Sequence, residues 1–132
     1  MIFVDAGPFL ARHGKRDQYH REAERLWPTL EPPILTTTLV IGEFATLLGR
    51  QIGFNHAVDR VRDVYESESI DILQFTREDE VAALGWMGKY ADHGIGFTDC
   101  LSFAMMRRHR IRAAFTFDRH FRDAGFEVVG LR

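Results

Sequence analysis

Short apolar runs alternate with longer stretches of helical periodicity along the whole chain, and this alternation is the feature that most constrains the fold. The runs are rich in β-branched and aromatic residues, as strands are. Strands that alternate with helices pair in parallel, and the helices then cover both faces of the sheet. We therefore predict an α/β fold, a three-layer α/β/α domain with a largely parallel sheet. The expected strands are Met1–Val4, Ile34–Thr37, Ile70–Leu73, Ala113–Phe117 and Phe126–Leu131.

The segments between the runs predict the helices. Tyr19–Leu30 has apolar residues at helical spacing on one side only, and Pro32–Pro33 ends it. The stretch Thr38–Arg50 is apolar almost all round and predicts a buried helix. We expect further helices from about Asn55 to Ser67, with Ala57, Val58, Val61, Val64 and Tyr65 inward, from Thr76 to Tyr90, and from Thr98 to the basic cluster at Arg107–Arg110.

Length and cysteine content set the class of protein. A chain of 132 residues suits a single domain, which we place at residues 1–132. Cys100 is the only cysteine, so no internal disulfide or cysteine-based zinc site can form, and a reducing cytoplasm is the expected location. The chain shows no secretion signal, and its apolar stretches are too short to cross a membrane.

The formal net charge of −2 excludes attraction of nucleic acid by bulk charge. A polyanion would have to be recruited locally. Arg107, Arg108, Arg110 and Arg112 could contact phosphates, or they could be the solvated end of a helix. The sequence leaves both interpretations open.

Four acidic residues follow the carboxyl ends of predicted strands, where open α/β sheets gather their ligands. Asp5 and Asp118 come directly after strands, and Glu43 and Asp99 lie within about one turn of a helix start. Each has a simpler structural explanation. Asp5 and Asp118 could cap the helical segments that follow them. The negative charge of Asp99 could simply interact favourably with the dipole at the start of its helix.

Glu43 is surrounded in sequence by apolar residues such as Leu39, Phe44 and Leu47, so we expect its helix to have no open solvent face. An unpaired carboxylate out of water costs several kcal/mol. Glu43 therefore needs an arginine, a metal ion or a polar cleft, unless that edge of the helix is wetter than it looks.

Several carboxylates in one place repel each other, and a divalent cation resolves the conflict. All-oxygen ligation favours Mg²⁺, with Mn²⁺ also possible, over zinc. Water activated by such an ion could hydrolyse a phosphodiester bond. The 6 histidines lack the paired spacing of zinc proteases, so we do not expect them to ligate metal.

The ordered set of motifs resembles the PIN-domain family, and within it the small VapC-like ribonuclease toxins of toxin–antitoxin pairs. The motifs are Asp5 after the first strand, Gly42-Glu43-Phe44, the run from Phe97 to Ala104 around Asp99, and Thr116-Phe117-Asp118-Arg119-His120-Phe121. The resemblance implies a PIN fold, RNA endonuclease activity with Mg²⁺ or Mn²⁺, a homodimer and a small antitoxin partner. It assigns metal ligation and catalysis to Asp5, Glu43, Asp99 and Asp118, with Thr116 supporting them.

Two other functions fit the acids less well. A catalytically silent PIN-like module could bind protein or RNA, but loss of an acid would be its expected sign. A small phosphatase is a third possibility. It is disfavoured because Asp5-Ala6-Gly7 lacks the second acid that a common aspartyl-phosphatase motif places two residues after the first.

Overall fold

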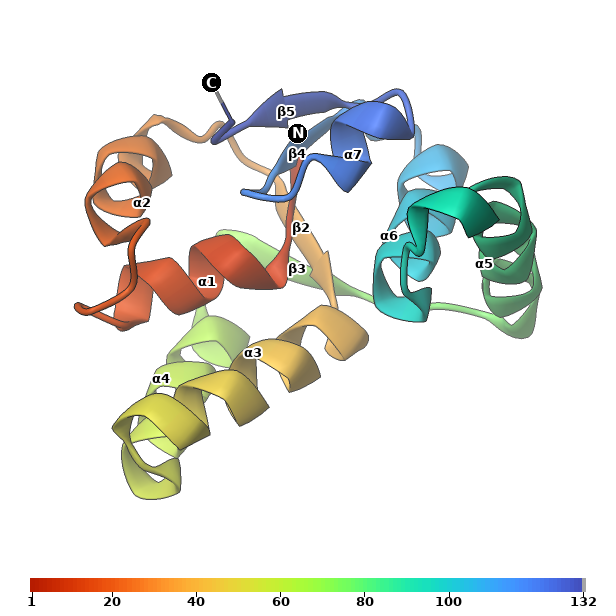
Figure 1. Cartoon of the computed structure of the whole chain (residues 1–132). Helices are drawn as coiled ribbons and strands as arrows, with labels where there is room; N and C mark the ends of the chain where they lie inside the picture. Colours follow the sequence, from red (N-terminus) through yellow and green to blue (C-terminus); the bar gives the residue numbers. More distant parts are fainter. Residues whose placement is uncertain (132) are drawn as a thin grey trace.

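A computed structural model describes residues 1–131 (Figure 1). Its strands are β1 (Ile2–Val4), β2 (Ile34–Thr37), β3 (Ile70–Leu73), β4 (Ala113–Phe115) and β5 (Glu127–Val129). Its α-helices are α1 (Ala6–His13), α2 (His20–Leu26), α3 (Thr38–Ile52), α4 (Phe54–Glu66), α5 (Arg77–Lys89), α6 (Phe97–Arg108) and α7 (His120–Asp123), and the 3₁₀ turns are η1 (Trp27–Thr29) and η2 (Ala91–His93).

The sheet is parallel throughout, in the order β3-β2-β1-β4-β5. The chain builds outward from β1 through β2 to β3, then returns to place β4 on the other side of β1. A parallel sheet has its ligand crevice where the strand order reverses in this way. The crevice here lies at the carboxyl ends of β1 and β4, which pair at Val4 and Phe115.

Helices α1 to α4 gather on one side of the sheet and α5 to α7 on the other (Figure 1). Each side has its own aromatic cluster. Phe9 packs against Trp27 and Phe44 at ring distances of 5.3 and 5.4 Å, and Phe103 packs against Phe121 and Phe126 at 5.0 and 5.6 Å. The predicted three-layer α/β/α fold with a parallel sheet is confirmed.

The ends of several elements differ from the sequence-based expectation. The segment predicted as one helix over Tyr19–Leu30 divides into α2 and η1, with Pro28 in the 3₁₀ turn. Proline suits the first turn of a helical segment and cannot continue the preceding one. Strand β4 ends at Phe115, so Thr116 and Phe117 belong to the loop beyond it. Within residues 1–131, no helix is long and apolar enough to cross a membrane.

Two of the arginines left open by the sequence have structural contacts. Arg108 pairs with the buried Asp79 of α5, Nε to Oδ1 at 2.7 Å. The guanidinium of Arg107 lies 4.5 Å from the ring centroid of Phe126, a cation–π arrangement. Both residues are exposed at the end of α6, as the solvated-end interpretation expects, and both also attach that end to neighbouring elements.

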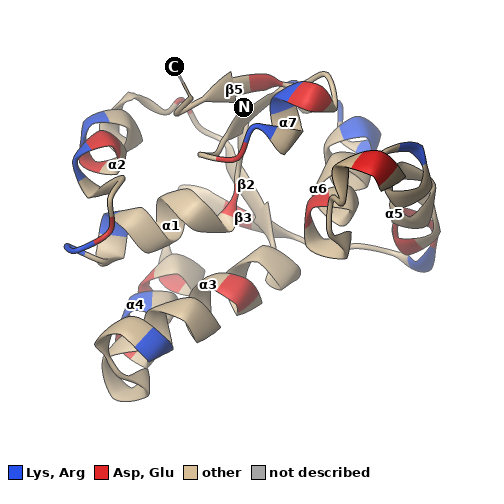
Figure 2. Cartoon of the chain, viewed as in Figure 1, with Lys and Arg blue, Asp and Glu red and all other residues tan. Residues whose placement is uncertain are grey.

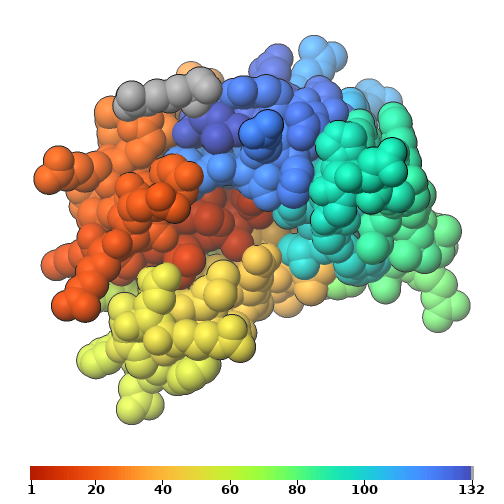
Figure 3. All heavy atoms as spheres, in the orientation of Figure 1, coloured from red at the N-terminus to blue at the C-terminus, as the bar shows by residue number. Residues whose placement is uncertain are grey.

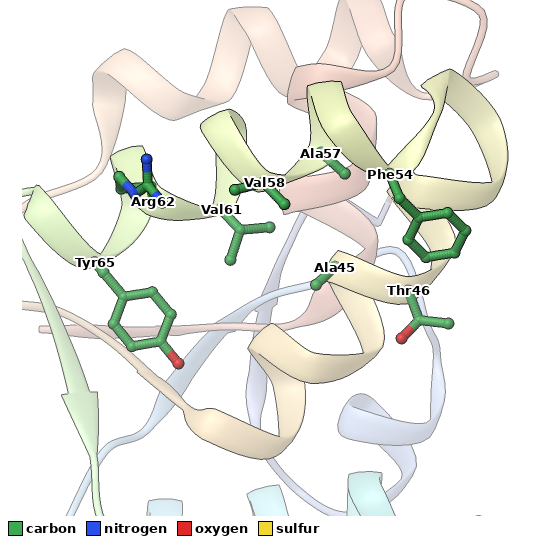
Figure 4. Close-up of a pocket in the computed structure, with 8 residues that line it drawn as sticks. All are labelled: Ala45, Thr46, Phe54, Ala57, Val58, Val61, Arg62 and Tyr65. Atoms are coloured by element: carbon green, nitrogen blue, oxygen red, sulfur yellow. The ribbon is translucent and has the colours of Figure 1, made fainter.

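The predicted inner face of α4 is partly wrong. Ala57 and Val64 are buried, but Val58 and Tyr65 are 52% and 54% exposed. Phe54, at the start of α4, is 61% exposed and lies over Gly49, where a Cβ would come within 2.5 Å of its ring. Helix α4 packs mainly on α3 and has only limited contact with the sheet, so part of its apolar side stays open. The opening is an apolar cavity of about 540 Å³ (Figure 4).

Candidate metal centre

The four predicted acids line a single cavity of about 260 Å³ at the crevice of the sheet. Asp5 follows β1, Glu43 lies on α3, Asp99 on the first turn of α6, and Asp118 on the loop after β4. Figure 2 shows acidic segments from these elements around a common centre, and Figure 3 shows the surface hollowed there. The fold thus brings together residues up to 113 positions apart, from Asp5 to Asp118.

Thr116 connects two of the acids. Its hydroxyl donates to Asp5 Oδ2 at 2.9 Å and accepts the backbone N–H of Asp118 at 3.0 Å. Asp5 stands at the N-cap position of α1, but its carboxylate makes no capping hydrogen bond. Capping therefore does not explain Asp5, and the supporting position that the family resemblance implied for Thr116 agrees with its contacts.

Burial, and after it the charges of neighbouring acids, raises the pKa values of Asp99 and Asp5. Burial raises the pKa of Asp99 from 3.8 to about 8, and the nearby charges of Asp5, Asp118 and Glu43 add to the rise. Burial raises the pKa of Asp5 to about 6, and hydrogen bonds from the Ala6 backbone N–H and the Thr116 hydroxyl oppose the shift. Such sites hold negative charge poorly by themselves, so a bound cation would stabilise their ionised form.

Asp118 also has the structural role that the sequence left open. Its Oδ1 accepts the backbone N–H of His120 at 2.9 Å, which orients the carboxylate at the start of α7. Capping and a place at the centre are compatible, because a carboxylate has two oxygens with several acceptor positions.

The expectation that the helix carrying Glu43 has no open solvent face is wrong. Glu43 is exposed and lies on an open side of α3, together with Gly42 and Thr46. The surrounding apolar residues Val40, Ile41 and Phe44 fill the opposite side of the helix. Glu43 is not buried, so its carboxylate does not need a partner for that reason. It lines the acidic cavity because the open side of α3 borders that cavity.

His120 is the residue that sequence reasoning missed. Its Nδ1 lies 3.2 Å from Asp118 Oδ1 and 3.6 Å from Asp99 Oδ2, and is buried without a hydrogen-bond partner. Ligand atoms of the three residues lie within 4.8 Å of one another. A search for paired histidines on one helix could not find this residue. The available signal was its position two residues after an acid at a strand end.

The donor set fits a divalent cation. Carboxylate oxygens suit hard ions such as Mg²⁺ and Mn²⁺, and one imidazole nitrogen is more compatible with Mn²⁺ than with Mg²⁺. The raised pKa values of Asp5 and Asp99 point to a missing positive charge, and His120 Nδ1, which makes no hydrogen bond, lies close enough to two of the acids to share a ligand site with them. The arrangement is an acidic cluster able to hold metal.

Comparison with known proteins now decides the family. The PIN domain model matches residues 2–127. The chain belongs to the PIN-domain family. This PIN domain is also 35% identical over 129 residues to the 23S rRNA-specific endonuclease VapC20 of Mycobacterium tuberculosis, a match that covers 98% of both chains.

Two solved structures resemble this PIN domain. The crystal structure of M. tuberculosis VapC20, described as a sarcin–ricin loop cleaving toxin, superposes with a TM-score of 0.91 at 33% identity, covering 100% of this chain and 99% of that one. A toxin–antitoxin complex from Klebsiella pneumoniae has a TM-score of 0.69 at 14% identity, covering 98% and 96%, and supports the fold alone. The predictions of a PIN fold and of a VapC-like endoribonuclease are confirmed.

Proposed function

We propose that this PIN domain is a toxin that cleaves 23S rRNA at the sarcin–ricin loop, with a divalent ion held by Asp5, Glu43, Asp99 and Asp118. The observation that carries the proposal is the convergence of these acids on one cavity, in a chain 35% identical over nearly its full length to a 23S rRNA-specific endonuclease. All four acids are present, which argues against a catalytically silent module.

The ion would be Mg²⁺ or Mn²⁺, with His120 near enough to Asp99 and Asp118 to join or support the ligand set. When bound, such an ion supplies Lewis-acid stabilisation of charge and lowers the pKa of water for hydrolysis of a phosphodiester bond. No such chemistry is available from the carboxylates alone.

The protein's own residues position this chemistry. Thr116 fixes Asp5 and the Asp118 backbone relative to each other, and the His120 N–H orients the Asp118 carboxylate. Leu10 and Leu47 form apolar walls of the cavity. Apolar walls limit the water around the acids and strengthen their interaction with a cation.

The partners follow from the relatives and from the family resemblance. We infer that the protein is cytoplasmic and acts on ribosomal RNA. We also infer that it binds a cognate antitoxin and forms a homodimer. The exposed apolar side chains of α4, Phe54, Val58 and Tyr65, are surface of the kind found at protein interfaces.

Replacing Asp99 tests the proposal. The purified chain should cleave a synthetic RNA hairpin containing the sarcin–ricin loop with Mg²⁺ or Mn²⁺, and should not cleave it with EDTA. Asp99→Asn should lower the cleavage rate by about 10²-fold or more, because ionised carboxylate at the ion is lost. Circular dichroism should show an unchanged fold.

Asp92→Asn is the matched control, since Asp92 is an exposed acid of η2 outside the cavity. It should cleave at the wild-type rate. Equal activity of Asp99→Asn and wild type would show that Asp99 is not part of the centre. Failure of the wild type to cleave the hairpin with any divalent ion would refute the proposed cleavage activity.

A further inference from the structure

A second polar cavity, of about 720 Å³, lies at the far ends of α1 and α3 and the start of α4. Its cationic residues are Lys15 and Arg16, which follow α1, and Arg60 of α4. Two acids, Asp17 and Asp59, also line it, so its charge is three positive against two negative. We call it the basic cavity.

The three cations are free to bind an external anion. Across residues 1–131, none of Lys15, Arg16 and Arg60 has an ion-pair or hydrogen-bond partner. The carboxylate of Asp17 accepts the backbone N–H of Tyr19 at 2.8 Å. By contrast, Arg108 and Arg25 elsewhere in the chain are already paired with carboxylates.

Arg60 faces the interior of the basic cavity. Burial lowers the pKa of His13 to about 4, the charges of Arg12 and Arg60 add to the shift, and Asp63 opposes it. His13 lines the same cavity and is neutral at pH 7. The cavity thus combines three permanent cations with an uncharged ring capable of hydrogen bonding.

The basic cavity lies beyond the acidic cavity along the same pair of helices. Leu10 of α1 and Leu47 of α3 line the acidic cavity. One turn further, Gly14, which follows α1, and Gln51 of α3 line the basic cavity. Helices α1 and α3 pack against each other and both run away from the carboxyl edge of the sheet, so the two cavities follow one another along this pair of helices (Figure 1).

The separation of the two cavities suits a nucleic-acid strand. From Ala6 to Gly14 the helical rise of about 1.5 Å per residue gives about 12 Å between the cavities. A stacked strand carries one phosphate per about 3.4 Å, so this separation corresponds to roughly three nucleotides. A chain with a net charge of −2 needs such a local site to hold a polyanion beside its acids.

We infer that the basic cavity binds a backbone phosphate of the RNA substrate, roughly three nucleotides from the bond that is cut. Lys15, Arg16 and Arg60 supply the positive charge. The inference rests on the proposed function, because it names where the RNA of that reaction lies. It assigns the cavity a role in holding the strand and none in the chemical step.

The inference is tested by measuring how strongly RNA binds to a variant that lacks two of these positive charges. The variant Lys15→Gln/Arg60→Gln is compared with Arg77→Gln/Arg122→Gln, which removes the same charge from exposed arginines outside both cavities. The probe is a fluorescein-labelled sarcin–ricin hairpin in EDTA, followed by anisotropy over a salt series. The cavity variant should bind about tenfold more weakly at low salt, with a slope of log affinity against log salt reduced by about 1.4.

Equal affinities and slopes for the two double variants would overturn the inference. It would also be overturned if the cavity variant lost affinity for polyglutamate and kept its affinity for RNA, since the cavity would then serve an acidic protein partner. A selective loss of RNA affinity supports it.

Cleavage with Mn²⁺ separates the inference from the proposed function. The cavity variant should show a raised KM with kcat within about twofold of wild type, as expected for loss of uniform binding. A lowered kcat with unchanged KM would contradict a strand-holding role. If the wild type fails to cleave, the proposed function is refuted, and the anisotropy comparison still decides whether the cavity binds RNA.

Discussion

At the scale of single residues, one buried hydroxyl connects two acids of the candidate metal centre. Thr116 is fully buried and serves both Asp5 and the Asp118 backbone, which belong to different strand ends. A supporting group of this kind orients ligands without touching substrate, and its loss typically lowers metal affinity or activity by about 10–100-fold.

Thr116→Val removes that hydroxyl and keeps the shape of the side chain. We expect cleavage to fall about 10–100-fold and the free energy of unfolding to fall by about 1–3 kcal/mol, because the Asp118 N–H loses its acceptor. Cleavage rates and chemical denaturation measure the two effects. Thr116→Ser keeps both hydrogen bonds and should retain most of the activity. Equal losses of activity in the Val and Ser variants would show that the hydroxyl does not support cleavage.

At the scale of elements, α5 and α6 are joined through one carboxylate. Asp79 is almost fully buried and completes the capping box of α5 with Thr76, whose backbone N–H lies 2.8 Å from its Oδ2. It also accepts two hydrogen bonds from Arg108, at 2.7 and 2.9 Å. Because α6 begins at the candidate metal centre, this connection helps to hold the helix that carries Asp99.

Asp79→Ala should lower the free energy of unfolding by about 2–4 kcal/mol, since it removes a helix cap and two charge-assisted hydrogen bonds. The control is Arg25→Ala, which breaks an exposed ion pair with Glu22 and should cost less than about 1 kcal/mol. Urea unfolding of both variants gives the comparison. Similar costs would show that the α5–α6 connection contributes little.

At the scale of the whole molecule, the unneutralised acids make stability depend on pH. In the folded chain the pKa of Asp99 is about 8, above its ordinary 3.8. Between these values the folded state binds more protons than the unfolded state, so the free energy of unfolding falls as the pH rises. The pKa of His13 is lowered from 6.5 to about 4, so its opposite effect is confined to lower pH.

In EDTA, the Tm should therefore fall between about pH 6.5 and pH 8.5, where Asp99 dominates the change. Asp99→Asn should flatten this fall, and saturating Mn²⁺ should raise the Tm more at the higher pH, since cations bind the ionised carboxylates. Differential scanning fluorimetry across that range measures all three. A Tm independent of pH in EDTA would contradict mutual crowding of the acids.

Much of the architecture was predictable because it follows from local chemistry. The apolar run Met1–Val4 predicts a strand, and the acids that follow Thr76 predict a helix start because they suit the helix dipole. The acids Asp5 and Asp118 could be placed at one edge because parallel strands share their carboxyl ends. These properties depend on neighbouring residues and on a general rule of sheet topology.

The sequence by itself determined the parallel α/β fold, its order of elements and the set of acids at the crevice. Only the tertiary structure decided that Glu43 lies on an open side of α3, that α4 leaves Phe54 and Tyr65 exposed, and that His120 comes within 3.6 Å of Asp99. The reason is physical: periodicity states which residues share a side of a helix, whereas exposure and contact depend on which other element packs there.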